Sequence, residues 1–379
     1  MRRMRLFTLA GIPVRIDLSW LVIAALVTGS LATGYFPPRV EGLGAGGYLL
    51  LGLLGALGLF GSIILHELAH ALVAIKNGIK MRGITLFIFG GVAEMEAEPS
   101  SAKVEFLVAA AGPAASILIS GVCHGLEALG HWAGWPAGLV AVFAYLGFIN
   151  LLLVAFNMVP AFPLDGGRVL RALLWHKSKN VVWATRITSN LGLGFGVLLI
   201  GLGFLLFLQG DIIGGIWLFM VGMFVRHAAG ASWRHVALRQ ALAGRQVRRY
   251  MTVNPLVVAP TLPVGELVDE VFMAHTHKMY PVVHSGALLG CVTLAAVQAL
   301  PRGRWGASVV ADIMEPVGPG NTVAAAADAL AAAAAMGRAG RSRMMVVEGG
   351  ELAGVVSIGD LLRVLTMQEA LRIPRQGRG

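Results

Sequence analysis

The chain has 379 residues, of which 56% are hydrophobic and 13% are charged, and its formal net charge is +10. Soluble globular proteins contain about 25% charged residues, so this composition excludes an ordinary soluble protein. Basic residues on cytoplasmic loops orient membrane proteins, so the charge does not indicate nucleic acid binding and we expect no nucleic acid partner. The apolar excess ends near residue 230, which predicts a membrane region followed by a soluble region.

Six apolar segments precede residue 230, and a membrane-spanning helix needs about 20 such residues. Arg15 and Asp17 interrupt the run after the basic N-terminus, so we expect the first segment to remain as a membrane helix instead of a cleaved signal peptide. With a cytoplasmic N-terminus, the external loops contain one basic residue, Arg39, and the internal loops are rich in Lys and Arg. We therefore expect a multi-pass protein of the cell membrane whose N-terminus and soluble region are cytoplasmic. The expected spans are 18–35, 48–75, 104–129, 137–159, 182–208 and 212–225.

The second span contains the sequence H-E-L-A-H at residues 66–70. Residues four apart project from one face of a helix, so His66 and His70 can bind the same metal ion. Glu67 lies beside them and can accept a proton from a water that a metal has acidified. Ionisable residues inside a membrane helix are costly unless they pair or bind a ligand, so this group indicates a functional site. The alternative is a structural polar cluster that faces other helices.

Residues 83–96, between the second and third spans, contain apolar β-forming residues on both sides of a Gly-Gly pair. This pattern predicts a β-hairpin. The segment is too short to cross the bilayer, so it must be buried in protein or line a cavity. A simple connector between two spans is the alternative.

A catalytic zinc site usually has three protein ligands, so the two histidines need a partner. Asp165 is the best candidate, because Pro160 and Pro163 break the helix ahead of it and the chain can then fold back into the membrane region. Asn157, two turns earlier, can donate a hydrogen bond to a developing oxyanion or hold the substrate backbone. The alternatives are a helix N-cap for Asp165 and a structural amide for Asn157.

Taken together, these motifs resemble the site-2 protease family of intramembrane metalloproteases. The resemblance covers the whole membrane region, and the motifs occur in the order found in that family. Ser116 stands where many members have Asn, and we assign it no role. The matching segments are H-E-L-A-H at 66–70, F-G-G-V-A at 89–93, A-G-P-A-A-S at 111–116 and N-x-x-P-x-x-P-L-D-G at 157–166.

The resemblance implies a zinc endopeptidase whose substrate is a membrane-anchored protein. A transmembrane substrate must unwind before cleavage, and unpaired backbone in lipid is costly. The edge of the hairpin can offset this cost by pairing with the extended substrate. The expected roles are binding of one Zn²⁺ by His66, His70 and Asp165, general base catalysis by Glu67, assistance at the substrate carbonyl by Asn157, and strand pairing by Phe89, Gly90, Gly91 and Val92.

After residue 245 the sequence contains an internal repeat with a period of 63–64 residues; for example, 281–283 matches 345–347. Each copy predicts a strand, a helix, two strands and a helix. This resembles a tandem cystathionine-β-synthase (CBS) pair, which implies an adenine nucleotide between the copies. Ser357 and Asp360 of the second copy are the candidate contacts to the nucleotide. The first copy has Ala296 at the position that corresponds to Asp360, so it lacks the carboxylate. A purely structural module that forms a homodimer is the alternative.

We therefore predict a polytopic α-helical membrane protein of about six spans, with a membrane-associated β-hairpin, followed by an α/β tandem CBS pair. Imidazole and carboxylate ligands favour zinc over other divalent metals. The alternative functions are a CBS-regulated transporter or channel and a catalytically inactive homologue. A transporter predicts ionisable residues along a pore and inverted repeats, and the sequence shows neither. The expected parts are a protease region at 1–230, a linker at 231–246, CBS domains at 247–308 and 309–372, and a flexible tail at 373–379.

Overall fold

A computed structural model describes residues 3–275 and 277–363. The end of the predicted second CBS domain and the predicted tail at 373–379 lie outside the described residues. The contacts divide the chain into two compact units, Met1–Arg234 and His235–Gly379. The N-terminal unit contains the apolar helices and a four-stranded sheet, and the C-terminal unit contains two sheets, one of four strands and one of three.

In the described part of the chain, five helices are long and apolar enough to cross a membrane. A sixth apolar helix is shorter, because α1 (Ser19–Ser30) continues as a wider helical turn that ends at Tyr35. The predicted polytopic membrane region of about six spans is therefore confirmed, with five long helices and one shorter helix. The long helices are α2 (Ala45–Lys76), α3 (Ala102–Ala133), α4 (Ala137–Asn157), α6 (Val181–Leu208) and α7 (Ile212–Leu242).

The last helix differs from the sequence-based expectation, which ended the sixth span at residue 225 and placed a linker at 231–246. The structure continues α7 to Leu242, through most of that segment. Residues 231–242 are rich in Ala, Leu and Arg and contain no Pro or Gly. These residue types favour a helix, so the chain continues as one after the apolar stretch ends.

The sheet of the N-terminal unit joins two hairpins in the order β1-β2-β3-β4. The predicted hairpin is present as β3 (Met81–Phe87) and β4 (Gly90–Met95), and β4 is an edge strand. The first hairpin, β1 (Arg3–Leu9) and β2 (Ile12–Asp17), was not predicted. Its turn residues Ala10 and Gly11 both have positive φ, as a two-residue hairpin turn requires.

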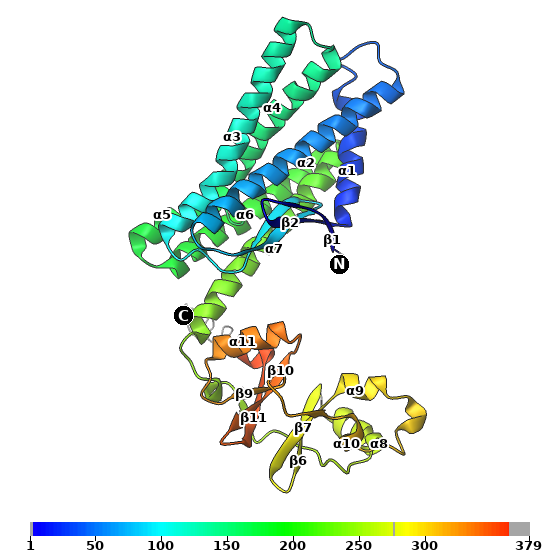
Figure 1. Ribbon diagram of the computed structural model, residues 1–379, viewed down its shortest axis with the longest axis vertical. Coiled ribbons are helices and arrows are strands. Elements are labelled where there is room, and N and C mark those ends of the chain that lie inside the picture. The colour runs from blue at the N-terminus through cyan, green and yellow to red at the C-terminus, as the bar shows by residue number, and fades with distance from the viewer. Residues whose placement is uncertain (1–2, 276, 364–379) are drawn as a thin grey trace, which may run out of the picture. The chain divides into compact units, whose positions relative to one another are not determined.

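Apolar side chains hold this sheet against α2. Ile12 of β2 and Ile84 of β3 are buried with Ala71 of α2, one residue after the H-E-L-A-H segment. Figure 1 shows the strands alongside the lower half of α2, with α3 and α4 as a long helical hairpin. The sheet thus lies beside the half of α2 that contains the candidate metal ligands.

A short loop, 158–164, connects α4 to α5 (Asp165–Ser178) and places Asp165 at the first residue of that helix. Gly166 and Gly167 allow the loop backbone to lie directly on the first turn of α5. A Cβ atom at Gly166 would collide with the carbonyl of Met158, and one at Gly167 with the backbone of Ala161. The double glycine after Asp165 is therefore required by close packing.

The C-terminal unit confirms the predicted repeat. The hairpin of β6 (Met279–His284) and β7 (Ala287–Thr293) recurs 64 residues later as β10 (Arg343–Glu348) and β11 (Glu351–Ser357). Both hairpins have a register irregularity at the equivalent position, between Val282 and Val283 and between Val346 and Val347. The remaining elements are β5 (Thr252–Val253), α8 (Val264–Glu266), α9 (Leu294–Ala299), α10 (Val310–Ile313), β8 (Glu315–Pro316), β9 (Thr322–Ala324) and α11 (Ala329–Arg338).

Each small sheet of this unit contains a strand from the other half of the repeat. The sheet orders are β5-β11-β10-β9 and β6-β7-β8, so β5 pairs with the second hairpin and β8 with the first. The buried residues Cys291 and Met345 lie in one cluster between the two hairpins. Burial raises the pKa of the Cys291 thiol to about 11, so this cysteine is protonated and unreactive at neutral pH.

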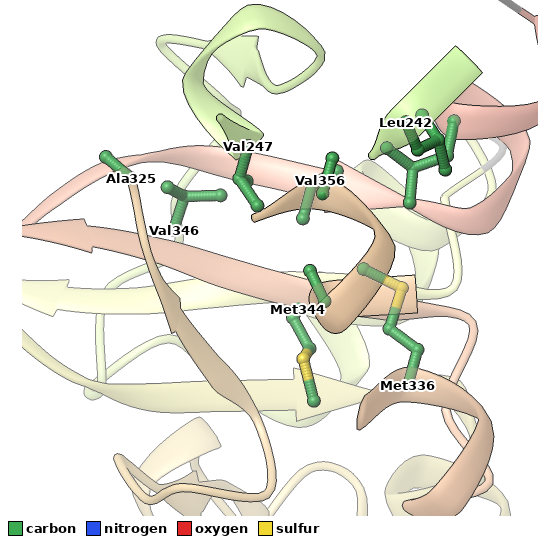
Figure 2. Close-up of a cluster of buried hydrophobic side chains, with 10 residues drawn as sticks. Leu242, Val247, Ala325, Met336, Met344, Val346 and Val356 are labelled. Carbon is green, nitrogen blue, oxygen red and sulfur yellow. The ribbon is translucent and has the colours of Figure 1, made fainter. Parts of the chain in front are cut away.

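The second half of the repeat has an apolar core that includes the end of α7. Figure 2 shows Leu242 among Met336, Met344, Val346 and Val356, which are all buried. Leu242 therefore belongs to the core of the C-terminal unit.

Replacing Leu242 with Ala is expected to lower the free energy of unfolding of the C-terminal unit by about 2–5 kcal/mol, because it leaves a cavity in this core. Hydrogen exchange of the β10 and β11 amides in the full-length protein measures the change. Met273→Ala is the control, since Met273 is 77% exposed. Equal exchange in both variants would contradict the assignment of Leu242 to the core.

Candidate metal centre

Three polar side chains from two helices converge in the N-terminal unit. His66 and His70 project from α2, and Asp165 is the first residue of α5. Oδ2 of Asp165 lies 3.1 Å from Nε2 of His66 and 3.2 Å from Nε2 of His70, and the two Nε2 atoms are 3.1 Å apart. All three residues are buried. The structure thus brings together the three residues that were predicted as metal ligands.

The hydrogen bonds of the outer ring nitrogens leave the inner nitrogens as acceptors. Nδ1 of His70 lies 2.6 Å from the carbonyl of Val108 in α3, and a carbonyl only accepts, so Nδ1 carries the proton. Nδ1 of His66 lies 3.0 Å from Oγ of Ser116, which can accept a proton in the same way. Two imidazole lone pairs and a carboxylate oxygen then face one another at about 3 Å. Such a group of acceptors is unfavourable without a cation between them.

The distances suit zinc. Zinc bonds of 2.0–2.2 Å to nitrogen and oxygen in a tetrahedron place neighbouring ligand atoms about 3.3 Å apart. Space for an ion is kept by Gly112 of α3, where an added Cβ atom would lie 2.5 Å from Nε2 of His66 and also collide with Nε2 of His70. In the described part of the chain, this is the group of His, Cys, Asp and Glu residues that could hold a metal ion.

Glu67 lies next to the histidines and contacts the edge strand of the sheet. Its Oε2 accepts a hydrogen bond of 3.0 Å from the backbone N–H of Ala93 in β4. Gly91, two residues earlier, permits this approach, because a Cβ atom there would lie 2.7 Å from Cγ of Glu67. The carboxylate beside the metal centre is therefore held by the strand that was predicted to bind the substrate.

Of the residues predicted to pair with a substrate, Gly90, Gly91 and Val92 lie in the edge strand β4. Phe89 lies instead in the turn before it. Its ring stacks on Phe224 of α7 with 4.7 Å between centroids. The hairpin tip is thus packed against a helix, and the edge available for pairing begins at Gly90.

Asn157 is the last residue of α4 and is half-buried. Among the described residues, no hydrogen bond joins its side chain to His66, His70 or Asp165. A second amide on the same helix was missed by the sequence analysis: Asn150 is fully buried and donates to Oγ of Ser62, one turn before His66, over 3.0 Å. Seven residues separate Asn150 from Asn157, so both lie on one face of α4.

Comparison with known proteins agrees with this geometry. A sequence profile of peptidase family M50 matches residues 54–131 and 128–201, and a CBS domain profile matches residues 247–299 and 310–367. Rip3 of Mycobacterium tuberculosis, which is named as a zinc metalloprotease, is 34% identical over 359 residues that cover 94% of this chain and 91% of Rip3. The chain belongs to peptidase family M50.

Two further relatives extend the comparison of this M50 chain. The zinc metalloprotease MJ0392 of Methanocaldococcus jannaschii is 29% identical over 367 residues, which cover 96% of each chain. The solved structure of the site-2 protease from Methanocaldococcus jannaschii is 30% identical and covers 61% of this chain and 95% of its own, with a TM-score of 0.42. The resemblance found in the sequence, to M50 proteases with CBS domains, is confirmed.

In the CBS pair of this M50 chain, Ser357 and Asp360 contact each other. Oγ of Ser357 donates to Oδ2 of Asp360 over 2.6 Å, and the N–H of Asp360 donates back to Oγ of Ser357 over 3.1 Å. Ser357 is therefore the N-cap of the helix that begins at residue 358, and Asp360 bonds back to the N–H of Ser357 from the first turn of that helix. Arg343, which the sequence analysis missed, pairs with Ser357 in the register of β10 and β11. Its Nη1 is buried and has no hydrogen-bond partner in the described part of the chain.

Replacing Gly112 with Ala is expected to abolish zinc binding, because the methyl group would occupy the space between the two Nε2 atoms. Metal content of the detergent-purified protein, measured by mass spectrometry, provides the readout. Gly121→Ala is a matched control on the same helix, since a Cβ atom there meets nothing within 4 Å. One zinc per chain in both variants would show that the metal lies elsewhere.

Proposed function

We propose that this chain is a zinc endopeptidase that cleaves a membrane-anchored protein within or near its transmembrane segment. His66, His70 and Asp165 are the proposed zinc ligands and Glu67 the general base. The observation that supports this most strongly is the convergence of three acceptor atoms at about 3 Å, with a carboxylate next to them. Two imidazoles and one carboxylate leave a fourth position open, as in catalytic zinc sites.

When bound, zinc supplies Lewis acidity, which acidifies water and polarises a carbonyl group. Glu67 accepts a proton from the attacking water and then gives it to the leaving amine. The N–H of Ala93 holds Oε2 of Glu67, so the carboxylate keeps one orientation during both transfers. Asn157 is proposed to donate to the substrate carbonyl oxygen, at which negative charge develops.

The substrate is proposed to add to the free edge of β4 at Gly90, Gly91 and Val92. The N–H of Ala93 points away from β3, because it donates to Glu67, so the N–H of Gly91 points to the same edge two residues earlier. Ala93 is already occupied by the general base. The ladder with the substrate therefore ends beside Glu67, which places the substrate backbone next to the group that moves the proton.

The proposed location is the cell membrane, with the N-terminus and the CBS pair on the cytoplasmic side. The bias of Lys and Arg toward the expected internal loops supports this orientation. His66 lies ten residues before Lys76, the last residue of α2, so about 15 Å of helix separates the metal centre from that end. Water is proposed to reach the centre from the cytoplasm along this distance.

Glu67→Gln is expected to keep zinc and to lose about 10²- to 10⁴-fold in cleavage rate, because the amide cannot accept the proton. Zinc content and cleavage of a single-span protein substrate in detergent are measured on the same preparation. Glu41→Gln, at an exposed position, is the control. A wild-type cleavage rate in Glu67→Gln would rule out Glu67 as the base.

We also infer that the CBS pair binds an adenine nucleotide at Ser357 and Asp360. The specific observation is Arg343, which pairs with Ser357 in the sheet and whose Nη1 is buried with no hydrogen-bond partner among the described residues. A buried guanidinium nitrogen without a partner is costly, and a phosphate oxygen would satisfy it. Regulation of the protease and formation of a homodimer through the CBS pair stay predictions from the family resemblance.

Titration calorimetry of the full-length protein with AMP and with ATP tests the nucleotide site. Arg343→Met is expected to weaken binding about 10-fold or more, since it removes a charge-assisted hydrogen bond. Arg304→Met, at an exposed position in the same unit, is expected to bind as the wild type does. Absence of binding heat for both nucleotides in the wild type would favour the purely structural role.

A further inference from the structure

A buried ion pair lies beside the metal centre and takes no part in the proposed chemistry. Nε of Arg171 in α5 donates to Oε1 of Glu105 in α3 over 2.6 Å, and Nη2 contacts the same oxygen. Glu105 is 0% exposed and Arg171 is 6% exposed. Desolvation of two ions costs several kcal/mol each, so a buried pair is a weak indication of stability. Its presence here calls for another explanation.

Glu105 belongs to the face of α3 that supports the two imidazoles. Residues three, seven and eleven positions after it fall on the same helix face. They are Val108, whose carbonyl accepts from His70, Gly112, which leaves space at both Nε2 atoms, and Ser116, which contacts Nδ1 of His66. Glu105 lies in the first turn of this helix. It therefore anchors the helix that orients both histidines.

Arg171 anchors the opposite side of the centre. It lies six residues after Asp165 in the same 14-residue helix. Its guanidinium also lies over the ring of Phe162, 5.2 Å from the centroid, in the loop that leads to Asp165. The N–H of Phe162 in turn donates to the carbonyl of Thr188 in α6 over 3.1 Å. One side chain thus contacts α3 and the loop that precedes the third candidate ligand.

We propose that the Glu105–Arg171 ion pair is a positioning element, which sets α3 against α5 and thereby holds Asp165 in place relative to His66 and His70. The inference rests on the proposed zinc site. The candidate ligands come from α2 and α5, and α3 packs against both helices. Apolar side chains permit small slides between helices, whereas a charged hydrogen bond forms only at one relative position.

The charges near the pair agree with this role. Oε2 of Glu105 is buried and has no hydrogen-bond partner in the part of the chain that the structure describes. The negative charge of Glu105 is therefore balanced mainly by Arg171. Arg168, one turn earlier on α5, is a second nearby positive charge. Loss of the guanidinium would leave a buried negative charge facing the helix of Asp165, so the two helices would separate or shift.

The test measures zinc affinity of the full-length protein in detergent by competition with a chelator. Arg171→Met and Glu105→Gln are expected to weaken zinc binding about 10- to 100-fold, as loss of a partner that orients metal ligands typically does. Cobalt substituted for zinc is expected to show an altered visible spectrum, which a change in overall stability alone would not produce. Arg248→Met is the matched control, because Arg248 pairs with Glu348 on the surface, where the side chains are 52% and 51% exposed.

The double variant Glu105→Leu/Arg171→Met separates positioning from stability. Replacing a buried ion pair by hydrophobic residues of similar volume often leaves stability unchanged. Positioning therefore predicts weak zinc binding with an unfolding temperature of the metal-free protein close to that of the wild type. Wild-type zinc affinity in both single variants overturns the proposal. The proposal is also overturned if, across the variants, the loss of zinc affinity follows the fall in the unfolding temperature of the metal-free protein.

Failure of this inference is distinguishable from failure of the proposed function. If the wild type holds no zinc even after addition of the ion, the zinc site itself is contradicted. If the wild type holds zinc and the variants hold it equally well, the zinc site stands and the positioning role of the ion pair is wrong.

Discussion

Three acceptor atoms about 3 Å apart are the constraint on which the N-terminal unit depends. The inner nitrogens of His66 and His70 and one oxygen of Asp165 repel one another unless a cation lies between them. In a membrane region this cost is higher than in water, because there is little solvent to screen it. The surrounding structure holds the three atoms together from outside, through hydrogen bonds to the far side of each imidazole and close helix packing at Gly112.

A small sheet accompanies the helices and contacts the carboxylate next to this centre. Helices alone satisfy their own backbone groups and offer no edge to an unwound substrate. The sheet packs on α2 through Ile12 and Ile84, and its edge strand β4 donates from Ala93 to Glu67. In the proposed function, this strand both holds the base and offers its edge to the substrate, which would connect substrate binding to the chemistry. The N-terminal hairpin, β1 and β2, forms the other half of the sheet that supports this edge.

Much of the site was predictable because its signals are local in the sequence. The four-residue spacing of His66 and His70 fixes their shared helix face, and the prolines before Asp165 indicate a break at which the chain can turn. The supporting contacts were not predictable in this way. The partner of His70 is a backbone carbonyl at Val108, which has no residue signature, and the partner of Glu105 lies 66 residues away. Such pairs depend on how two helices slide and rotate against each other, which a hydrophobic pattern does not determine.

Two elements of the fold, the first hairpin and the last part of α7, were not predicted for similar physical reasons. The first hairpin was overlooked because its turn, Ala10 and Gly11, lacks the Asn-Gly or Asp-Gly pair that usually marks such turns. The predicted span at 212–225 is shorter than α7, which continues to Leu242, because loss of hydrophobicity ends a membrane span without ending a helix. At the first turn and at the end of α7, the backbone conformation is set by the local preference of the residues, which hydrophobicity and the usual turn pairs do not reveal. A chain that passes from lipid to water therefore requires separate arguments for where it leaves the membrane and where its helix ends.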